Sequence, residues 1–506
     1  MRHTALLLLI TCLSACSGQA VFPDPPPRAG SYHLDPPADA PLARITGRLT
    51  AVHRGLSGVY PVTSAQNALA VRLAAIRSAR SSIDIQYFIF RRDETGLLLT
   101  RELIEAANRG VRVRFLLDDF TTGDADRVLA LLDLHPNIQI RLFNPFPHKG
   151  PRALELLADF PRLHRRMHNK SLTADNRISF IGGRNLSNQY FGIDKTITFG
   201  DLDLLAIGPV VSDISRQFDL YWNSRYSFPV SSVIDYRPTL AQQQDFVDEL
   251  NTNAQQLLAS DYGRSLERSP VIRTLSEDDG LWYWGKTLAV YDPPDKITLA
   301  PPEAGRYAER DLLWRINAAK QQLIIISPYV LPGPDYLGQL IAAAQRGVEI
   351  HILTASLSSS DMVLVHGAYR KYRKPLLEAG IHLYEMSNAR KYKLDNWQQG
   401  SRSLLHAKAF AVDKQTLYVG SLNLDPRSIY LNTELGLLIE SPQLTGKVAE
   451  NFIENIPHHA YRLELRNGRI YWHRGDGEVL SRDPGASLLQ RLGSRIGSWL
   501  PIEHLL

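Results

Sequence analysis

Two copies of one short pattern carry the chemistry that this sequence predicts. The chain reads HNKSLTAD at 168–175 and HAKAFAVD at 406–413, and both fit H-x-K-x4-D. Each copy is followed at the same offset by a glycine-containing turn that ends in asparagine, at 182–185 and 420–423. A neutral imidazole can attack phosphorus, and a protonated one can donate to a leaving oxygen. The two copies therefore predict phosphodiester chemistry at a site that pairs two histidines.

The lysines complete this prediction. The alternation H-x-K places a histidine and a lysine on one face of a strand, so two neighbouring copies would bring two imidazoles and two ammonium groups together. Two lysines can neutralise the non-bridging oxygens of a phosphodiester and stabilise its five-coordinate transition state. We therefore predict four catalytic residues, His168, Lys170, His406 and Lys408.

The chain repeats one order of elements around these patterns. Each half begins with a helix and a strand, continues with a helix that ends in a basic residue and glycine, and then has two strands. The expected elements lie at 67–79, 83–90, 98–110, 111–117 and 139–143, and again at 310–319, 323–330, 337–347, 348–354 and 381–385. Helices that alternate with β-branched strands favour βαβ units. The sequence therefore predicts two similar α/β halves, each a mixed, mostly parallel sheet flanked by helices, sharing one active site at their interface.

Less regular segments separate and follow the halves. We expect the halves at 45–227 and 306–486, with a connecting segment at 228–305 between them. The last segment, 487–506, carries apolar residues at helical spacing: Leu488, Leu489, Leu492, Ile496, Trp499 and Leu500. This amphipathic pattern is compatible with a membrane interface and with packing on the domain, and the sequence leaves both open.

The N-terminus carries the pattern of a lipoprotein signal peptide, predicted at 1–15. A basic start precedes an apolar run at 5–13 that is too short to span a membrane. The phrase LSAC at 13–16 then resembles a lipobox, in which the cysteine is acylated after cleavage before it. We therefore expect Cys16 to be lipidated and to begin the mature chain.

The residues around Cys16 refine this expectation. Cys12 is the chain's other cysteine and falls within the signal peptide, so no intrachain disulfide is expected. Ser17, in place of aspartate, favours the outer membrane by resemblance to Gram-negative lipoproteins. Residues 16–44 are rich in proline and predict an extended tether. We expect a periplasm-facing lipoprotein of the bacterial cell envelope.

Composition narrows the classes of partner. The net charge of +5 is mildly favourable for anionic partners but does not separate nucleic acid from anionic lipid. The chain lacks a basic stripe with interleaved aromatics of the kind that tracks nucleic acid. It also lacks a cysteine cluster and an H-E-x-x-H sequence, which disfavours a metal site.

The duplicated pattern resembles that of the phospholipase D superfamily, in which two H-x-K-x4-D halves form one active site. The resemblance covers 45–506, and several phrases look most like the bacterial cardiolipin synthase C type: RLFNPF at 141–146, RRMHNKSLTAD at 165–175, DLDLLAIGPVV at 201–211 and GSLNLDPRS at 420–428. This resemblance implies transfer of a phosphatidyl group onto a lipid hydroxyl without a metal or other cofactor. It implies phospholipid partners, phosphatidylglycerol and phosphatidylethanolamine, association with a membrane, and no nucleic acid.

The resemblance also assigns roles to residues. It makes His168 the nucleophile that forms a phosphohistidine and His406 the acid. It makes four side chains ligands of the phosphate, namely Lys170, Lys408, Asn185 and Asn423.

The acidic residues have two predicted roles. Asp175 and Asp413 complete the two catalytic patterns, although in this family they usually support structure. The carboxylate that orients each histidine comes at the start of a later strand. We expect Asp203 to orient the first histidine and Glu434 the second, with Asp201 as a rival for the first role.

Three alternative functions remain beside phosphatidyl transfer. A phospholipase would use the same residues with water as acceptor, a nuclease would act on a nucleic acid diester, and a binding protein would be catalytically idle. The complete catalytic set argues against the last. The lipid tether argues against the nuclease, because it holds the enzyme at a surface where lipid is concentrated. Transfer and hydrolysis both stay open, since they differ in how far the pocket excludes water.

Overall fold

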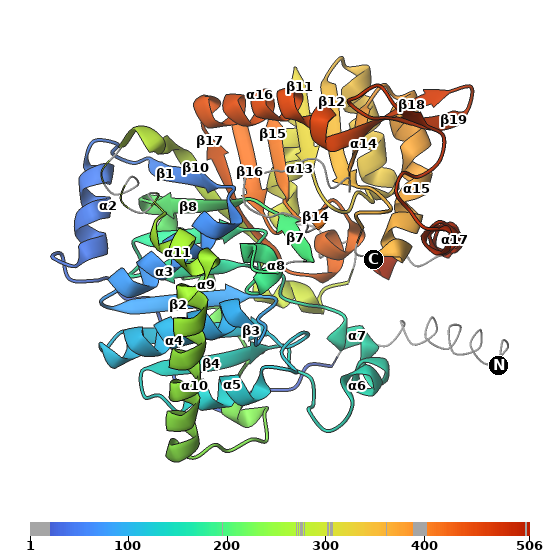
Figure 1. Cartoon of the computed structure of the whole chain (residues 1–506). Coiled ribbons are helices and arrows are strands. Elements are labelled where there is room, and N and C mark those ends of the chain that lie inside the picture. Colours follow the sequence, from blue (N-terminus) through green and yellow to red (C-terminus); the bar gives the residue numbers. More distant parts are fainter. Residues whose placement is uncertain are drawn as a thin grey trace.

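The computed structural model describes residues 21–194, 196–269, 279–300, 307–360, 362–387, 402–500 and 503–505, with 271, 273, 277 and 303. The predicted signal peptide and Cys16 lie outside these residues. The described chain folds into two similar α/β halves, one above the other in Figure 1. No helix among the described residues combines the length and hydropathy needed to cross a bilayer.

The first half is built on one mixed sheet. Its strands lie in the spatial order β8 (Asp203–Ile207), β6 (Ile178–Gly182), β5 (Ser171–Ala174), β2 (Ser82–Tyr87), β3 (Arg112–Asp118), β4 (Ile138–Phe143) and β9 (Ser227–Pro229). The predicted strands at 83–90, 111–117 and 139–143 are confirmed as β2, β3 and β4.

The second half repeats this order strand for strand. Its strands are β17 (Leu435–Glu440), β16 (Thr416–Gly420), β15 (Ala409–Val412), β11 (Gln322–Ile326), β12 (Glu349–Ala355), β13 (His382–Met386) and β18 (Ala460–Arg466). A hairpin of β18 with β19 (Arg469–His473), followed by β20 (Val479–Leu480), extends the edge. The predicted internal repeat is therefore confirmed.

Two further strands join the halves. β1 (Ser57–Val62) pairs with β8, β10 (Tyr283–Tyr291) pairs with β17, and β1 and β10 pair with each other. β10 therefore occupies the same place beside the sheet of the second half as β1 occupies beside the sheet of the first. The predicted connecting segment, 228–305, therefore also supplies a strand of the repeat.

The direction of the strands corrects another expectation. Parallel pairing within the large sheet is confined to β2–β3–β4 and β11–β12–β13, and the remaining pairs are antiparallel, so the sheet is mixed but not mostly parallel. The reason lies in the turns after each H-x-K pattern. Asp175 and Asn176 have φ of 53° and 49°, and Asp413 and Lys414 have 52° and 53°. Two successive residues in this region make tight hairpin turns, which require antiparallel neighbours.

Helices cover both faces of the sheets. One face is covered by α3 (Ala65–Ser78), α4 (Glu94–Asn108) and α5 (Asp126–Asp133) in the first half, and by α13 (Ala308–Ala318), α14 (Gly333–Gln345) and α15 (Val363–Glu378) in the second. The opposite face packs on α9 (Pro209–Trp222) and α16 (Pro442–His459). Gly110 and Gly347 follow α4 and α14 with φ of 88° and 90°, as expected for glycines that end helices.

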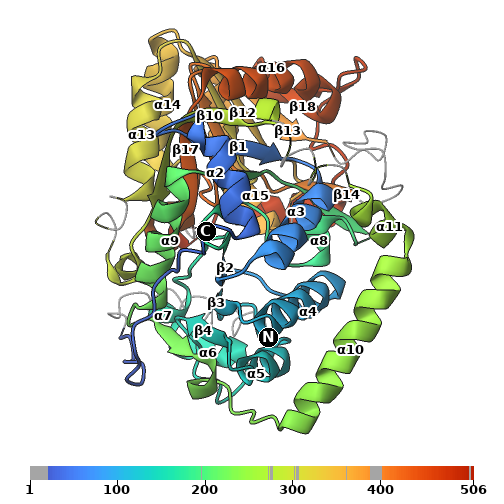
Figure 2. The ribbon, with the colours of Figure 1, turned by 90° about the vertical axis from the view of Figure 1, so that its left-hand side faces the viewer.

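A buried cluster crosses the boundary between the halves. It combines Val59, Leu204 and Ile214 of the first half with Leu417 and Leu437 of the second, all at most 1% exposed. Figure 2 shows the first half below the second, with α10 (Leu240–Ala259) along its outside. The joined sheets and this shared core fix how the two H-x-K patterns face each other.

The described part of the predicted tether is not detached from the first half. Residues 21–40 lack helix and strand, as their prolines predict, but they pack along its surface. The ring of Phe22 meets Tyr226 edge to face at 5.2 Å, and Nδ1 of His33 lies 2.7 Å from a carboxylate oxygen of Asp219. The helix α2 (Pro41–Ala51) then begins before residue 45, where the globular part was expected to start.

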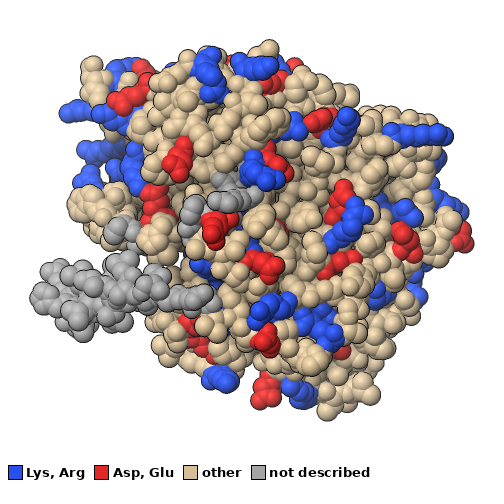
Figure 3. Space-filling view, turned by 180° about the vertical axis from the view of Figure 1, so that it is seen from behind, with Lys and Arg blue, Asp and Glu red and all other residues tan. Residues whose placement is uncertain are grey.

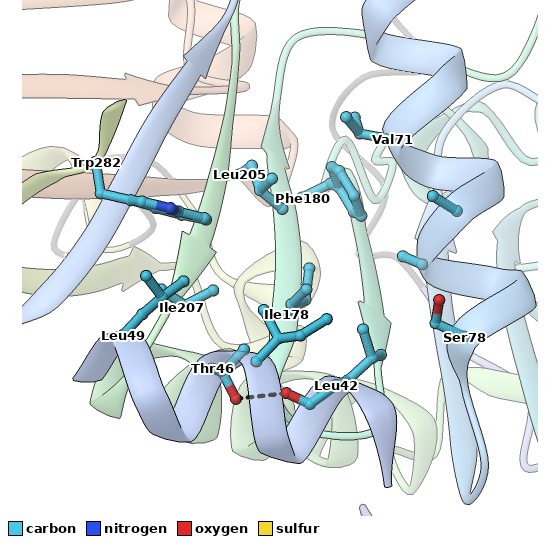
Figure 4. Close-up of a pocket in the computed structure, with 13 residues that line it drawn as sticks. Leu42, Thr46, Leu49, Val71, Ser78, Ile178, Phe180, Leu205, Ile207 and Trp282 are labelled. Carbon is cyan, nitrogen blue, oxygen red and sulfur yellow. Dashed lines mark hydrogen bonds between the residues drawn. The ribbon is translucent and has the colours of Figure 1, made fainter. Parts of the chain in front are cut away.

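An apolar cavity of about 80 Å³ lies between α2 and strands β6 and β8 (Figure 4). Leu49, Phe180 and Trp282 are among its lining residues. The hydroxyl of Thr46 donates to the carbonyl oxygen of Leu42 at 2.8 Å, so this group is satisfied within the helix. The predicted catalytic residues do not line this cavity, which belongs to the packing of α2.

Candidate active site

A second cavity, of about 390 Å³, opens between the halves. Residues of both repeated patterns line it, namely His168, Asn185, His406, Lys408 and Asn423. The structure therefore brings the two patterns, 238 positions apart by the residue numbers 168 and 406, to one cavity.

Each H-x-K segment is attached to the backbone of the opposite half. The backbone N–H of His168 donates to the carbonyl oxygen of Thr433 at 2.9 Å. Strands β7 (Ile197–Gly200) and β14 (Arg402–Leu405) pair in parallel, and the N–H of His406 donates to the carbonyl of Gly200 at 2.9 Å. Both histidines stand just before their strands, β5 and β15, rather than within them.

The orienting carboxylates correct the sequence-based assignment. Nδ1 of His168 lies 2.9 and 3.1 Å from the two carboxylate oxygens of Glu434, and Nδ1 of His406 lies 2.6 Å from Asp201. The predicted pairs, Asp203 with His168 and Glu434 with His406, are therefore wrong. Each carboxylate serves the histidine of the opposite half, and Asp201, the rival, acts on His406.

Asp203 has a different set of partners. One of its carboxylate oxygens lies 2.7 Å from Arg72 and 3.3 Å from Arg184, and all three side chains are buried. Asp203 therefore neutralises two buried arginines behind the site.

The register of the strand pairs explains why Asp203 was predicted in place of Asp201. Asp203 lies opposite Gly182 in the β6–β8 pair, whereas Gly436 lies opposite Gly420 in the β16–β17 pair. The counterpart of Glu434 is therefore Asp201, two residues before the register position. The sequence holds this signal, because DLDLL at 201–205 aligns with ELGLL at 434–438.

The glycines of the first turn make room for these carboxylates. A Cβ on Gly183 would lie 2.1 Å from a carboxylate oxygen of Asp201, and one on Gly182 would lie 2.2 Å from Asp203. The second half has Ser421 at the place of Gly183, and its hydroxyl donates to Glu434. The GGRN and GSLN turns thus position the carboxylates as well as the asparagines.

Burial and charge set the protonation of the first histidine. Burial lowers the pKa of His168 to about 4, with the charge of Glu434 opposing this shift and those of Lys170 and Lys408 adding to it. The ring is therefore neutral near pH 7. Glu434 accepts from Nδ1, which leaves the lone pair on Nε2 for chemistry.

The second histidine has a charged partner. Burial raises the pKa of Asp201, but the interactions with His406 and Lys408 lower it by more, so the pKa is held at about 2. Burial and Lys408 lower the pKa of His406, and Asp201 opposes that shift. An ionised Asp201 at 2.6 Å stabilises the imidazolium that forms when His406 takes up a proton.

Each lysine binds the backbone carbonyl of its own histidine, and of the two lysines only Lys408 lines the cavity. Lys170 is 1% exposed, and its Nζ donates to the carbonyl oxygen of His168 at 2.6 Å. Nζ of Lys408 donates to the carbonyl of His406 at 2.5 Å. Burial lowers the pKa of Lys170 to about 7, with Glu434 opposing and Lys408 adding to the shift.

The aspartates of the two H-x-K-x4-D patterns stabilise the fold by accepting backbone hydrogen bonds. The carboxylate of Asp175 accepts the backbone N–H groups of residues 80, 81 and 82 at 2.7–3.1 Å, ahead of β2. Asp413 accepts those of residues 320, 321 and 322 in the same way, ahead of β11. Their inclusion with the catalytic residues is therefore wrong, because neither lines the cavity and both cap strands.

The two asparagines line the cavity with different partners. Asn185 accepts from the N–H of Ile89 at 3.2 Å and donates to the hydroxyl of Tyr190 at 2.9 Å. The Oδ1 atom of Asn423 is buried without a hydrogen-bond partner. Their predicted role in binding phosphate stays a prediction.

Sequence reasoning missed the aromatic and cationic groups around the histidines. Phe88 meets His168 edge to face at 5.2 Å, and Tyr190 meets His406 in the same way at 5.1 Å. Arg427 also lines the cavity and donates to the carbonyls of His164 and Leu505 at 2.7 and 2.6 Å. Arg427 stands in the phrase GSLNLDPRS, so the resemblance pointed to it without giving it a role.

Side-chain clusters with metal-ligand chemistry lie elsewhere. Among the described residues they are Glu349 with His351 and His382, and His366 with Glu385 and Asp483. In the second cluster the guanidinium of Arg373 lies 2.7 Å from Glu385 and 2.8 Å from Asp483, so both carboxylates are already paired with a cation. Neither cluster lines the catalytic cavity.

Comparison with known proteins gives one match in each half. A family model described as "Cardiolipin synthase, PLD-like domain" matches residues 73–222 and 312–456. Cardiolipin synthase C of Escherichia coli (strain K12) is 38% identical over 478 residues, which cover 92% of this chain and 99% of that protein. A cardiolipin synthase of Staphylococcus aureus is 25% identical over 403 residues, covering 78% of this chain and 65% of that protein.

A solved structure shares the fold. The crystal structure of phosphatidylserine synthase from Haemophilus influenzae Rd KW20 matches with a TM-score of 0.57 at 14% identity. The match covers 91% of this chain and 100% of that one. At this identity the likeness extends to the fold alone.

Proposed function

Because this chain belongs to the phospholipase D superfamily, in the family of the cardiolipin synthase PLD-like domain, we propose that it is a membrane-tethered phosphatidyltransferase of cardiolipin synthase type. One observation carries the proposal. The histidines of both halves line one cavity, and each is oriented by a carboxylate of the opposite half. Such a site holds a neutral nucleophile and an acid together.

The first step forms a covalent intermediate. Nε2 of His168 attacks the phosphorus of a donor lipid, phosphatidylglycerol or phosphatidylethanolamine, and the bond from phosphorus to the headgroup oxygen breaks. His406 gives its proton to that oxygen, so the headgroup leaves as an alcohol, glycerol or ethanolamine. The phosphatidyl group is then bound to His168 as a phosphohistidine.

The second step regenerates the enzyme. His406, now neutral, takes the proton of a headgroup hydroxyl on phosphatidylglycerol, and the resulting oxygen attacks phosphorus. The phosphorus–nitrogen bond breaks, and His168 returns to its neutral form. The product is cardiolipin, a lipid with two phosphates and four acyl chains.

The cations supply the charge stabilisation for both steps. We expect Lys408, which lines the cavity, to contact the equatorial oxygens, and the buried Lys170 to act on them through its charge. Asn185 and Asn423 would donate hydrogen bonds to the same oxygens. Two lysines and two histidines supply the charge stabilisation and the acid–base groups that a metal would otherwise supply. Turnover should therefore survive EDTA, and activity lost to the chelator and restored by a divalent ion would contradict this assignment.

The lining of the cavity favours transfer over hydrolysis. Aromatic and aliphatic side chains surround the polar groups, including Phe88, Phe120, Phe160, Tyr329 and Met362. An apolar lining lowers the local concentration of water and accommodates the glycerol and acyl parts of a lipid.

The tether belongs to the same proposal. Lipidation of Cys16 would hold the enzyme at the periplasmic face of a membrane, in line with the outer-membrane preference that Ser17 indicates. A single acyl chain gives marginal binding, whereas a lipoprotein anchor with several chains gives stable binding. Cys16→Ser should therefore weaken membrane attachment in cell fractionation.

The direct test of the proposed function is lipid analysis by mass spectrometry in cells that lack other cardiolipin synthases. Expression of the chain should restore a tetra-acylated, doubly phosphorylated lipid, and expression of His168→Ala or His406→Ala should not. Phosphatidic acid as the sole product would favour the phospholipase. Cleavage of plasmid DNA without lipid turnover would favour the nuclease.

A further inference from the structure

The C-terminal helix α17 (Leu488–Gly497) packs on α15 through its small residues. A Cβ on Gly367 of α15 would lie 2.5 Å from the carbonyl oxygen of Ser494, and one on Gly497 would lie 3.1 Å from that of Leu364. The hydroxyl of Ser494 lies 3.1 Å from Nδ1 of His366. The helix is therefore fixed to the second half by close backbone contact.

The large apolar residues of α17 and of the turn after it face outward. Five of them are between 46% and 81% exposed: Leu488, Leu489, Leu492, Ile496 and Trp499. Four recur at helical spacing along one side, at 488, 492, 496 and 499. A soluble surface rarely leaves such a stripe bare, and a stripe of this kind marks an interaction site.

This stripe continues to the opening of the catalytic cavity. Leu364 is 44% exposed and contacts Gly497, and Met362, which lines the cavity, is 48% exposed. Across the opening, Phe120 of the first half also lines the cavity and is 40% exposed.

The helix α6 (Arg152–Ala158) extends the same surface on the first half. Leu154 and Leu157 are 62% and 51% exposed, and Leu156 between them lines the cavity. We call these exposed side chains the apolar rim. They are Leu488, Leu489, Leu492, Ile496 and Trp499 at α17, Met362 and Leu364 at the start of α15, and Phe120, Leu154 and Leu157 in the first half. Both halves contribute to it, and it borders the site of the proposed chemistry.

Basic side chains accompany the apolar rim. Arg495 is exposed on α17, and Arg491 and Arg370 stand near it, half-buried. Figure 3 shows an uncharged lobe at its left edge, at the place of α17 in Figure 1, with lysine and arginine side chains beside it. Apolar residues flanked by arginines match the layers of an anionic bilayer, in which acyl chains lie beneath phosphates.

We propose that the apolar rim inserts into the interface of an anionic phospholipid bilayer and holds the opening of the catalytic cavity against the lipid. This inference rests on the proposed function, because a phosphatidyltransferase takes both of its substrates from a bilayer. A tether at Cys16 limits the distance of the enzyme from the membrane but not its orientation. The apolar rim fixes that orientation, so that a headgroup reaches His168 while its acyl chains stay near the bilayer.

A fluorescent probe at one position tests insertion. The full chain with Cys12→Ser and Cys16→Ser has no other cysteine, so Leu492→Cys can carry a single polarity-sensitive label. Leu240→Cys is the matched control, because Leu240 is 74% exposed on α10, far from α17 in Figure 1. Vesicles of phosphatidylglycerol and phosphatidylethanolamine should shift the emission of the label at 492 to the blue and leave that at 240 unchanged. Equal responses at the two positions, or none at 492, would overturn the proposal.

Activity on two forms of the lipid separates this inference from the proposed function. Leu489→Glu with Leu492→Glu should lower turnover on vesicles by about tenfold or more, since each buried leucine contributes about a factor of ten in affinity. Turnover on lipid dispersed in detergent should stay unchanged, and Leu240→Glu should change neither. Equal loss on both forms of lipid would overturn the proposal.

Failure of the proposed function and burial of the apolar rim by a second copy of the chain give different results. If the wild-type chain turns over no lipid in either form, the proposed function fails, while the label at 492 still decides insertion. If that label is already blue-shifted without vesicles and the chain sediments as a dimer, a second copy covers the apolar rim and the membrane proposal is wrong.

Discussion

At the scale of residues, the site depends on carboxylates that cross between the halves. Glu434 fixes the tautomer of His168 from the opposite half, and Asp201 does the same for His406. Asp203, one of the residues that the sequence favoured, binds Arg72 and Arg184 instead. Asp201, just before β8, and Asp203, its first residue, therefore have separate roles, one in chemistry and one in stability.

This separation predicts opposite effects of two conservative substitutions. Glu434→Gln removes the charge that orients His168 and should lower kcat by about 10²-fold or more, with little change in thermal stability. Asp203→Asn leaves two buried arginines short of a counter-charge and should lower the free energy of unfolding by about 3 kcal/mol or more. Steady-state kinetics and thermal denaturation of both variants check this. The reverse pattern would restore the sequence-based assignment.

The shifted pKa values predict the pH dependence of kcat/KM. His168 acts while neutral, so activity should rise as pH increases through its lowered pKa of about 4. His406 and Lys170 both act while protonated, so activity should fall as pH increases through their lowered pKa values, about 7 for Lys170. Arginine stays protonated at these pH values, so Lys170→Arg should make the alkaline limb less steep, because His406 alone then titrates there. An alkaline limb of unchanged steepness in this variant would remove Lys170 from the titration.

At the scale of elements, the turn after each H-x-K hairpin sets the space for a carboxylate. A side chain at position 183 would meet Asp201 at 2.1 Å. Gly183→Ala should displace Asp201 from His406 and lower kcat by about 10²-fold, because small misplacements in an active site are costly.

A second glycine provides the control for this substitution. Gly446 lies within α16, and a Cβ there meets nothing within 4 Å. Gly446→Ala should leave kcat unchanged and raise the free energy of unfolding by roughly 0.5–1 kcal/mol, since alanine favours helix. Normal kinetics in Gly183→Ala would contradict the close contact with Asp201.

The capping aspartates give a further prediction for the elements. Asp175 binds three successive backbone N–H groups ahead of β2 and lies outside the cavity. Asp175→Ala should therefore lower the free energy of unfolding by about 1–3 kcal/mol while the folded fraction keeps its kcat. Chemical denaturation measures the free energy of unfolding, and kinetics on the folded enzyme measure kcat. A stable but inactive variant would return Asp175 to the catalytic residues.

Local pattern predicted the elements well and their pairing less well. The apolar strands at 83–90 and 323–330, and the helices that end at Gly110 and Gly347, follow from periodicity and capping, which are local. The direction of β5 and β6 depends on the left-handed turn at Asp175 and Asn176, which apolar periodicity does not indicate. Which histidine each carboxylate meets depends on how the two halves pack against each other, which no short window of sequence contains.

At the scale of the whole molecule, the two halves form one sheet and one site. β1 and β10 join the half-sheets, and the backbone of each half binds the histidine of the other. The repeat predicted that two H-x-K patterns would meet. It did not predict that β10 completes the second half, because its aromatic sequence lacks the apolar alternation of the other strands.

The proposed mechanism passes through one covalent intermediate, and locating that intermediate on the chain is the most direct measurement. Brief incubation with phosphatidylglycerol labelled at phosphorus, quenching in base and peptide mapping by mass spectrometry would place the label, since phosphohistidine survives base. We predict label on His168 in the wild-type chain and in a slowed His406→Ala variant, and none in His168→Ala. Label on His406 alone, or turnover without any labelled histidine, would contradict a single site with His168 as its nucleophile.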